Sequence, residues 1–246
     1  MIDIYMVFGP PASGKSSLIG YFDEKRTIST GNILRSMGLA RKDGTLVEDR
    51  IVNKILIENL LNRSDADFII LDGYPRREEQ AKFLRFLEKT SVIRLRMFME
   101  LSCSDENVID RSCNRLVCDC GASYHPTLKP SKIENECDIC HGRLQKREDD
   151  TPQTIRQRLN IYRSQCDAIR PYFKDIRHLV DVNDDPSASL KEALEIIKGS
   201  RAFHLCSDET NYELNCANSA RRLVRCICHH ADRERHIVKP CGKIKS

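Results

Sequence analysis

The sequence has no run of about 18 consecutive apolar residues, the length that a membrane-spanning helix requires. Its first residues, MIDIYMVFGPP, lack a basic stretch followed by a small-residue cleavage site, so no signal peptide is expected. Both absences predict a cytoplasmic protein with no membrane partner. With 40% hydrophobic and 31% charged residues among 246, the composition suits one substantial core and a small additional module.

The chain also has little net charge outside its C-terminal part. The formal net charge is +4, and residues 199–246 account for all of it, with nine Lys and Arg against five Asp and Glu. Residues 1–198 are therefore neutral overall. Phosphate-backbone binding relies on clustered cations, so this neutrality argues against nucleic acid as a partner.

Cysteine, in contrast, is abundant, with 12 in the chain. Paired cysteines in a reducing cytosol are typical of metal ligands. Cys118-x-Cys120 and Cys137-x-x-Cys140, separated by sixteen residues, predict a closed tetrahedral site for a structural Zn²⁺. The first pair is one residue shorter than the common C-x-x-C spacing. Two alternatives therefore remain open. His125 or His141 could replace one thiol as a ligand, or the thiols could bind no metal.

Hydrophobic runs alternate between the patterns of strands and helices, which predicts a parallel α/β sheet. Residues 115–150 interrupt the alternation with Cys, Gly and Pro and are expected to be an insertion. The strands are expected at residues 2–8, 67–72, 92–99 and 177–182, and the helices at residues 48–62, 77–88 and 151–173.

The segment GPPASGKS (9–16) matches G-x-x-x-x-G-K-[ST] between a predicted strand and a helix that is expected to start near Lys15. Backbone N–H groups of such a loop surround phosphate oxygens, and the helix N-terminus adds a positive dipole end. Lys15 is expected to reach the terminal phosphates, and Ser16 or Ser17 to offer a hydroxyl near Mg²⁺. The predicted nucleotide loop comprises Gly9, Pro10, Pro11, Ala12, Ser13, Gly14, Lys15, Ser16 and Ser17.

Two further segments carry candidate site residues. LDGYPR (71–76) follows a predicted strand at its carboxyl end, where α/β proteins form their sites. Asp72 is placed there to act on Mg²⁺ through water. Arg35, in STGNILR (29–35), and Arg76 are two cations able to hold a second phosphate.

From residue 2 to residue 198, the sequence resembles the adenylate kinases, and more broadly the nucleoside monophosphate kinases that have a zinc-bearing lid. The resemblance implies a P-loop kinase of the α/β class, with a five-stranded parallel sheet flanked by helices. It divides the chain into a core (1–114 and 151–198), a lid (115–150) and a Cys/His-rich basic tail (199–246) of unknown role. The segments that carry it, in order, are GPPASGKS, STGNILR, DGTLV (43–47), LDGYPR with Gln80, DRSCNR (110–115), CGASYH (120–125), CDIC (137–140), REDD (147–150) and RQRLNIY (156–162).

The resemblance implies reversible transfer of a phosphoryl group from an NTP to an NMP, with ATP and AMP as the expected pair, Mg²⁺ as cofactor and structural Zn²⁺. It implies in-line transfer between two bound nucleotides inside a closing lid, by a monomer. The residues expected to be catalytic are Lys15, Arg76, Arg115, Arg147 and Arg158. The donor nucleotide is expected to bind to the phosphate loop, Arg111 and Arg115, so Arg115 belongs to both the catalytic and the donor-binding residues. The acceptor side comprises Thr30, Arg35, Leu46, Val47, Gly73, Arg76, Gln80, Arg147 and Arg158.

The sequence departs from the family pattern at several positions. Ala12 stands where glycine is usual, and it is expected to fit only with a negative φ. Asn32 stands where Asp is usual, and the acceptor-binding region, about residues 30–50, is shortened by roughly ten residues between Arg35 and Gly44. Monophosphates other than AMP therefore remain alternative acceptors. Asp149 and Asp150 are expected to be hinge residues or partners of arginines rather than general bases.

Two other functions remain open on the sequence alone. The paired cysteines and the basic tail are also compatible with a nucleic-acid-binding zinc-ribbon ATPase, and the shortened acceptor region with a nucleotide sensor that transfers nothing. The tail holds five Cys and four His, and it could bind a second metal or a partner.

Overall fold

The computed structural model describes residues 1–39, 47–147 and 150–205, with the side chains of the last five excepted. Its centre is a five-stranded sheet in the order β2-β3-β1-β4-β8, parallel throughout, which confirms the predicted sheet. Four strands lie where the hydrophobic runs predicted them, whereas the short β2 was not predicted. The strands are β1 (Ile2–Phe8), β2 (Thr27–Ser29), β3 (Phe68–Asp72), β4 (Ile93–Ser102) and β8 (Arg177–Asp181).

Alternate residues of each central strand face opposite sides of this sheet and enter two separate cores. On β1, Ile4 and Met6 belong to one buried cluster, and Tyr5 and Val7 belong to the other. All four are at most 1% exposed. Burial on both faces explains why residues 4–8 of the strand form a continuous hydrophobic run without alternating polar residues.

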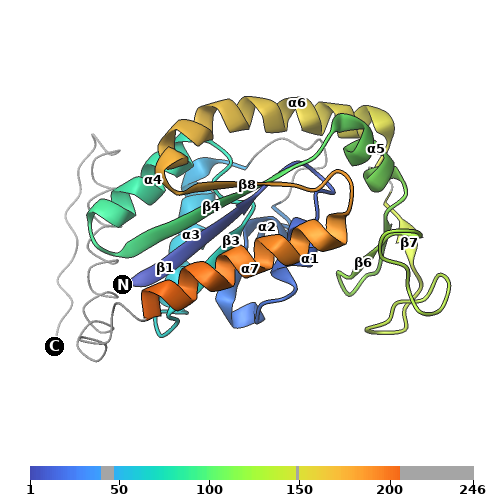
Figure 1. Ribbon diagram of the computed structural model, residues 1–246, viewed down its shortest axis with the longest axis horizontal. Coiled ribbons are helices and arrows are strands. Elements are labelled where there is room, and N and C mark those ends of the chain that lie inside the picture. The colour runs from blue at the N-terminus through green and yellow to red at the C-terminus, as the bar shows by residue number, and fades with distance from the viewer. Residues whose placement is uncertain (40–46, 148–149, 206–246) are drawn as a thin grey trace.

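Helices cover both faces of the sheet, and α7 lies across the front face in Figure 1. The helices predicted at residues 48–62 and 77–88 are confirmed within about one residue. The helix predicted to Phe173 ends at Ile169, because Pro171 lacks the N–H that would continue it. Residues 199–205, assigned to the tail from the sequence, continue α7. The helices are α1 (Lys15–Ile19), η1 (Glu24–Arg26), α2 (Thr30–Ser36), α3 (Asp49–Leu61), α4 (Glu78–Lys89), α5 (Asp105–Cys113), α6 (Pro152–Ile169), η2 (Arg170–Ile176) and α7 (Pro186–Leu205).

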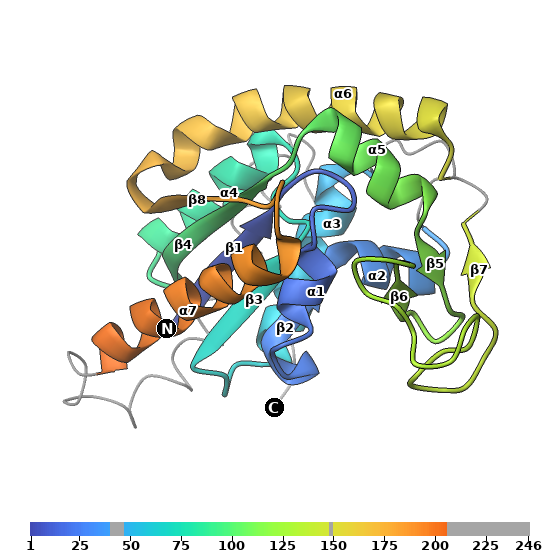
Figure 2. The same ribbon diagram turned by 45° about the vertical axis from the view of Figure 1, so that its right-hand side comes forward.

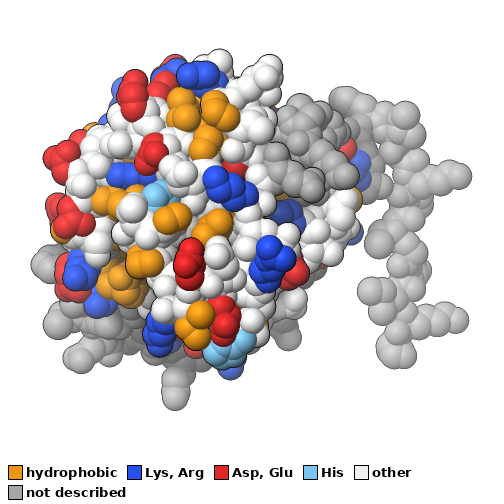
Figure 3. Space-filling view, turned by 90° about the vertical axis from the view of Figure 1, so that its right-hand side faces the viewer, with side chains coloured by type: hydrophobic (Ala, Val, Ile, Leu, Met, Phe, Trp, Pro, Cys, Tyr) orange, Lys and Arg blue, Asp and Glu red, His pale blue; other side chains and the backbone are white. Residues whose placement is uncertain are grey.

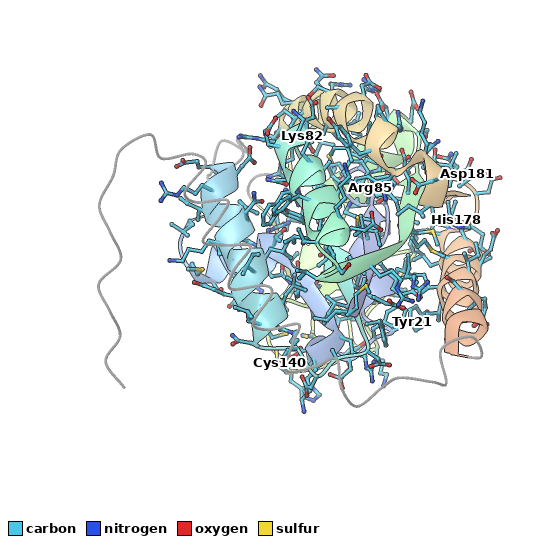
Figure 4. The ribbon with its side chains drawn as sticks, turned by 90° about the vertical axis from the view of Figure 1, so that its left-hand side faces the viewer. Tyr21, Lys82, Arg85, Cys140, His178 and Asp181 are labelled. Atoms are coloured by element: carbon cyan, nitrogen blue, oxygen red, sulfur yellow. The ribbon has the colours of Figure 1, made fainter. Side chains whose placement is uncertain are left out.

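A buried carboxylate connects the sheet to the segment after α6. Glu100 on β4 is 1% exposed and accepts hydrogen bonds from Arg170 Nε at 3.1 Å and from Arg177 Nε at 2.7 Å. Burial alone would raise the pKa of Glu100, but the hydrogen bonds from the two arginines outweigh it and lower this pKa. Figure 4 views this side of the molecule, with Arg85 on α4 and His178 on the edge strand β8.

The segment between α5 and α6 forms a second, small sheet, separate from the first in Figure 2. Its strands β5 (Leu116–Val117), β6 (Ser123–Tyr124) and β7 (Gln145–Lys146) are antiparallel, in the order β6-β5-β7. Four buried side chains form its interior: Cys118, Tyr124, Cys137 and Leu144. Figure 3 views the molecule from the side of this small sheet and shows hydrophobic and charged side chains interspersed on its surface. Among the helices of the described ranges, none is long and apolar enough to cross a bilayer.

Candidate active site

The predicted site residues meet at the carboxyl ends of three neighbouring strands. The register pairs Val7 of β1 with Asp72 of β3, and Asp72 with Ser29 of β2. The loop that follows β1, the turn that follows β3 and the start of α2 therefore begin at the same edge of the sheet. This edge is where open parallel sheets bind ligands.

The phosphate loop connects β1 to α1, which begins at Lys15 as predicted. Gly14 has φ of 94°, a conformation that glycine adopts without steric cost. Ala12 has φ of 53°, so the expectation of a negative φ at this position is wrong. The loop requires a left-handed residue here, and an alanine in that region costs about 1–2 kcal/mol relative to the right-handed conformation.

Lys15 lies over its own loop. Its Nζ donates to the carbonyl oxygens of Gly9 at 2.8 Å and Pro10 at 2.6 Å. Burial lowers the pKa of Lys15 to about 8, and the charge of Asp72 opposes part of this shift while Arg76 adds to it. The ammonium is therefore poorly compensated by its surroundings, and an anionic ligand in the loop would hold its proton.

Hydrogen bonds hold the start of α2 against the end of β3. Ser29 Oγ donates to Asp72 Oδ2 at 2.8 Å, and Thr30 Oγ1 donates to the Gly73 carbonyl at 3.0 Å. Thr30 is only 2% exposed, and its hydroxyl links the start of α2 to the turn after β3. Asp72 lies at the same strand end as the phosphate loop.

Two arginines converge beside Gly31. A Cβ placed on Gly31 would lie 3.5 Å from Arg35 Nη1 and 3.7 Å from Arg76 Nη2, so any larger residue would contact both guanidinium groups. Gly73, with φ of 69°, leaves space for Arg76 in the same way. Arg35 also donates to the amide oxygen of Asn32, which carries no charge to neutralise it.

The pKa values of both arginines are lowered, mainly by burial and, at Arg35, also by neighbouring positive charge. Burial lowers the pKa of Arg76, and Asp72 opposes the shift. Partial burial lowers the pKa of Arg35, and the charges of Arg147 and Arg76 lower it further. Like charges near each other are stabilised when a polyanion lies between them, so the arrangement suits a phosphate.

Gln80, in the first turn of α4, is 3% exposed and has a partner at each end of its amide. Its Oε1 accepts from the Arg76 backbone N–H at 2.7 Å, and its Nε2 donates to Asp49 Oδ1 at 2.7 Å. Val47 is partly buried against the core that contains Leu56 and Leu84. Leu46 lies outside the described residues.

An ion pair joins the two ends of residues 115–150, the segment predicted to be a lid. Asp150 accepts from Arg115 Nε at 3.0 Å and Nη2 at 2.6 Å, and from Arg158 Nη1 at 3.3 Å. The predicted role of Asp150 as a partner of arginines is thereby confirmed. Asp149 lies outside the described residues.

Arg111 on α5 is 7% exposed and is held at both ends of its guanidinium group. Nη1 donates to Cys103 Sγ at 3.4 Å, and Nη2 donates to the Asn183 carbonyl at 2.9 Å. The Asn183 side chain in turn accepts from the Ser104 N–H at 2.7 Å, at the start of α5. The loop after β8 is thus tied to the helix that leads into the lid.

The four cysteines of the lid form one cluster, with their sulfur atoms within 4.8 Å of one another. Cys118 Sγ lies 3.3 Å from Cys140 Sγ, and Cys120 Sγ lies 3.6 Å from Cys137 Sγ. Neither histidine considered as a substitute belongs to this cluster. His125 Nδ1 accepts from the Leu128 N–H at 3.3 Å, and His141 Nδ1 lies 2.7 Å from Glu136 Oε1. The short C-x-C spacing therefore still permits four convergent thiols.

Several residues around the site were not predicted from the sequence. Asp49 and Asn183 act through contacts with residues far along the chain, and no local pattern marks them. Cys103 contacts Arg111, eight residues later, and no motif marks it either. Ser29 lies inside STGNILR, but the motif gives no indication of its bond to Asp72.

The family model for adenylate kinase matches residues 7–178. The chain belongs to the adenylate kinase family. It is 36% identical over 208 residues to an adenylate kinase of Methanosarcina barkeri, covering 78% of this chain and 95% of that protein. It is 37% identical over 194 residues to the adenylate kinase of Methanosarcina acetivorans, covering 72% of this chain and 89% of that protein. The adenylate kinase of Mycoplasmopsis pulmonis is 35% identical over 214 residues, covering 80% and 96%.

Adenylate kinases are nucleoside monophosphate kinases, so the chain is assigned to an enzyme family of phosphotransferases. The match includes the phosphate loop from Gly9, both arginines beside Gly31 and the whole cysteine cluster. Its relatives in this family do not favour a nucleic-acid-binding ATPase.

Proposed function

We propose that this chain catalyses the reversible reaction of ATP and AMP to two ADP. The observation that carries the proposal is the convergence of Arg35 and Arg76 at the same sheet edge as the phosphate loop. The phosphate loop with Lys15 suits the phosphates of a donor, and the pair Arg35 and Arg76 suits the phosphate of an acceptor. An enzyme with a phosphate loop that transfers the phosphoryl group to water needs only the first, so the second group favours transfer to a phosphorylated acceptor.

In the proposed reaction, an oxygen of the AMP phosphate attacks the γ-phosphorus of ATP. The new P–O bond forms as the bond to the β–γ bridging oxygen breaks, and that oxygen leaves with ADP. No group of the protein is acylated or phosphorylated on the way. The enzyme therefore acts by alignment and by neutralising charge.

Each residue has a proposed task. The amides of residues 9–17 and Lys15 hold the donor phosphates, and Arg111 lies along the donor base. Arg35 and Arg76 hold the acceptor phosphate beside Gly31 and Gly73, with Thr30, Leu46, Val47 and Gln80 around the acceptor nucleoside. Arg115, Arg147 and Arg158 neutralise the transferring group when the lid closes and excludes water.

The oxygen donors Asp72, Ser16 and Ser17 suit Mg²⁺, a hard cation that prefers oxygen ligands and often retains several waters. When bound, Mg²⁺ would neutralise charge on the donor phosphates. The four clustered thiols suit Zn²⁺, whose tetrahedral sites bring four sulfur atoms about this close together. In this proposal the zinc is structural, because four protein ligands leave no open position for chemistry.

We assign residues 1–114 and 151–198 to the core and 115–150 to the lid, in a cytoplasmic monomer. Residues 199–246 receive no role in the reaction.

A panel of monophosphates with ATP as donor tests the proposal, with ADP formation measured by a coupled assay. We expect AMP to be the best acceptor, and Arg76→Ala to lose at least about a hundredfold in kcat/KM. Arg50→Ala, which removes an exposed cation on α3, should leave the rate unchanged. Folded, zinc-loaded protein that transfers phosphate to no monophosphate would refute the function.

A further inference from the structure

The amide of Gln80 is held in one orientation by partners of opposite character. A backbone N–H, that of Arg76, faces Oε1 at 2.7 Å, and the Asp49 carboxylate faces Nε2 at 2.7 Å. Rotating the amide by 180° would bring N–H against N–H at Arg76 and oxygen against oxygen at Asp49. Both hydrogen bonds would be lost and both replaced by repulsion, inside a site where Gln80 is 3% exposed.

Asp49 is itself fixed in place. It is the first residue of α3, where the exposed N–H groups of the helix favour a carboxylate. Its second oxygen, Oδ2, lies 3.5 Å from Arg77 Nη1. The carboxylate is therefore directed toward Gln80 from one side and held by a cation from the other, and it can only accept hydrogen bonds.

Among the described residues, these two bonds leave the Gln80 amide one N–H and one lone pair. The same bonds fix the order of the remaining donor and acceptor, with the nitrogen on the Asp49 side and the oxygen on the Arg76 side. Adenine offers N1 as acceptor beside the N6 amino group as donor, which matches this order. Hypoxanthine offers the reverse, an N1–H donor beside an O6 acceptor, and in the same place it would require the rotated amide.

We propose that Asp49, together with the Arg76 backbone N–H, determines specificity by holding Gln80 in the orientation that pairs with a 6-aminopurine acceptor and rejects a 6-oxopurine. The inference rests on the proposed function, since it assigns the acceptor base to Gln80. It goes beyond that function because it names the groups that select the base without contacting it. Asp49 is a positioning residue here.

The test compares Asp49→Asn with wild type, with AMP and IMP as acceptors and saturating ATP. Asparagine can present either its oxygen or its amino group to Gln80, so the rotated amide becomes accessible. We expect kcat/KM to fall for AMP and rise for IMP, which narrows the ratio of the two by about five- to tenfold. A residue needed only for folding would lower both values alike and leave the ratio unchanged.

Glu48→Gln is the matched control, because it removes a neighbouring exposed carboxylate that has no bond to Gln80. The control should keep the wild-type ratio. If Asp49→Asn does not fold, Asp49→Ser serves instead, since a hydroxyl both donates and accepts and suits a helix start. Asp49→Glu should retain the selection for AMP.

Outcomes separate this inference from the proposed function. Turnover of AMP with an unchanged ratio in Asp49→Asn and Asp49→Ser overturns the role of Asp49 and leaves the kinase function intact. The same holds if wild type uses AMP and IMP equally. If wild type transfers to no monophosphate and binds neither AMP nor IMP in calorimetry, both proposals are refuted.

Discussion

Asp150 accepts hydrogen bonds from two nitrogen atoms of Arg115, a residue thirty-five positions earlier, and so closes residues 115–150 into a loop at its base. The Asp150 side chain is 2% exposed and that of Arg115 is 18% exposed, so water screens the pair only weakly. The geometry fixes a proposed catalytic arginine at the hinge of the proposed lid.

Replacing Asp150 with Asn should therefore reduce both stability and activity. The amide offers one acceptor oxygen where the carboxylate offers two, and it removes the negative charge that faces Arg115 and Arg158. We expect a loss of about 2 kcal/mol in the free energy of unfolding, the range for hydrogen bonds to charged groups, and a lower kcat, measured by thermal melting and the coupled assay. Glu134→Gln, which removes an exposed lid carboxylate, should change neither, and equal losses in both variants would contradict the assignment.

The pKa of Lys15 predicts how ATP binding depends on pH. Burial lowers this pKa from 10.5 to about 8, so most of the side chain is an ammonium at pH 7, about half of it near pH 8, and the charge is lost as the pH rises further. ATP affinity, measured by calorimetry from pH 7 to pH 9.5, should fall above pH 8, by at most about tenfold for each pH unit. Lys15→Met should bind ATP more weakly and without this dependence. A parallel decline in the variant would assign the effect to another group.

The left-handed Ala12 predicts a stabilising substitution inside the phosphate loop. Ala12→Gly removes a steric cost of about 1–2 kcal/mol but adds roughly 0.5–1 kcal/mol of chain entropy to the unfolded state. We expect a net gain of about 0.5 kcal/mol from these two terms, visible as a higher midpoint in chemical denaturation. Ala193→Gly, in the interior of α7, should instead lose about 1 kcal/mol. A loss at both positions would mean that Ala12 is not strained.

Metal content tests the cysteine cluster directly. Cys118→Ser removes one of four convergent thiols, so the purified protein should contain less zinc and its melting temperature should fall by at least about 4 °C. Cys113→Ser changes a cysteine outside the cluster and should retain the zinc content of wild type. Unchanged zinc and stability in Cys118→Ser would mean that Cys118 is not a ligand.

The sequence by itself determined the features whose physical causes are local. The phosphate loop follows from glycines and a lysine at short spacing after a hydrophobic strand, and α1 begins at Lys15 as predicted. The unbroken hydrophobic runs at residues 4–8 and 68–71 predicted strands buried on both faces, and the helix at Thr151 begins with a side-chain cap followed by proline. The cysteine pairs predicted a cluster because each pair lies within a few residues. β2 was missed because three residues carry too little pattern.

Only the tertiary structure decided which distant residues meet. Gln80 and Asp49 lie 31 positions apart, and Arg111 and Asn183 lie 72 apart, so no spacing rule connects either pair. The left-handed φ of Ala12 also required the structure, since it depends on how the loop closes between β1 and α1. Short-range propensity and periodicity act along the chain, whereas these contacts depend on the register of parallel strands whose ends come together at one edge of the sheet.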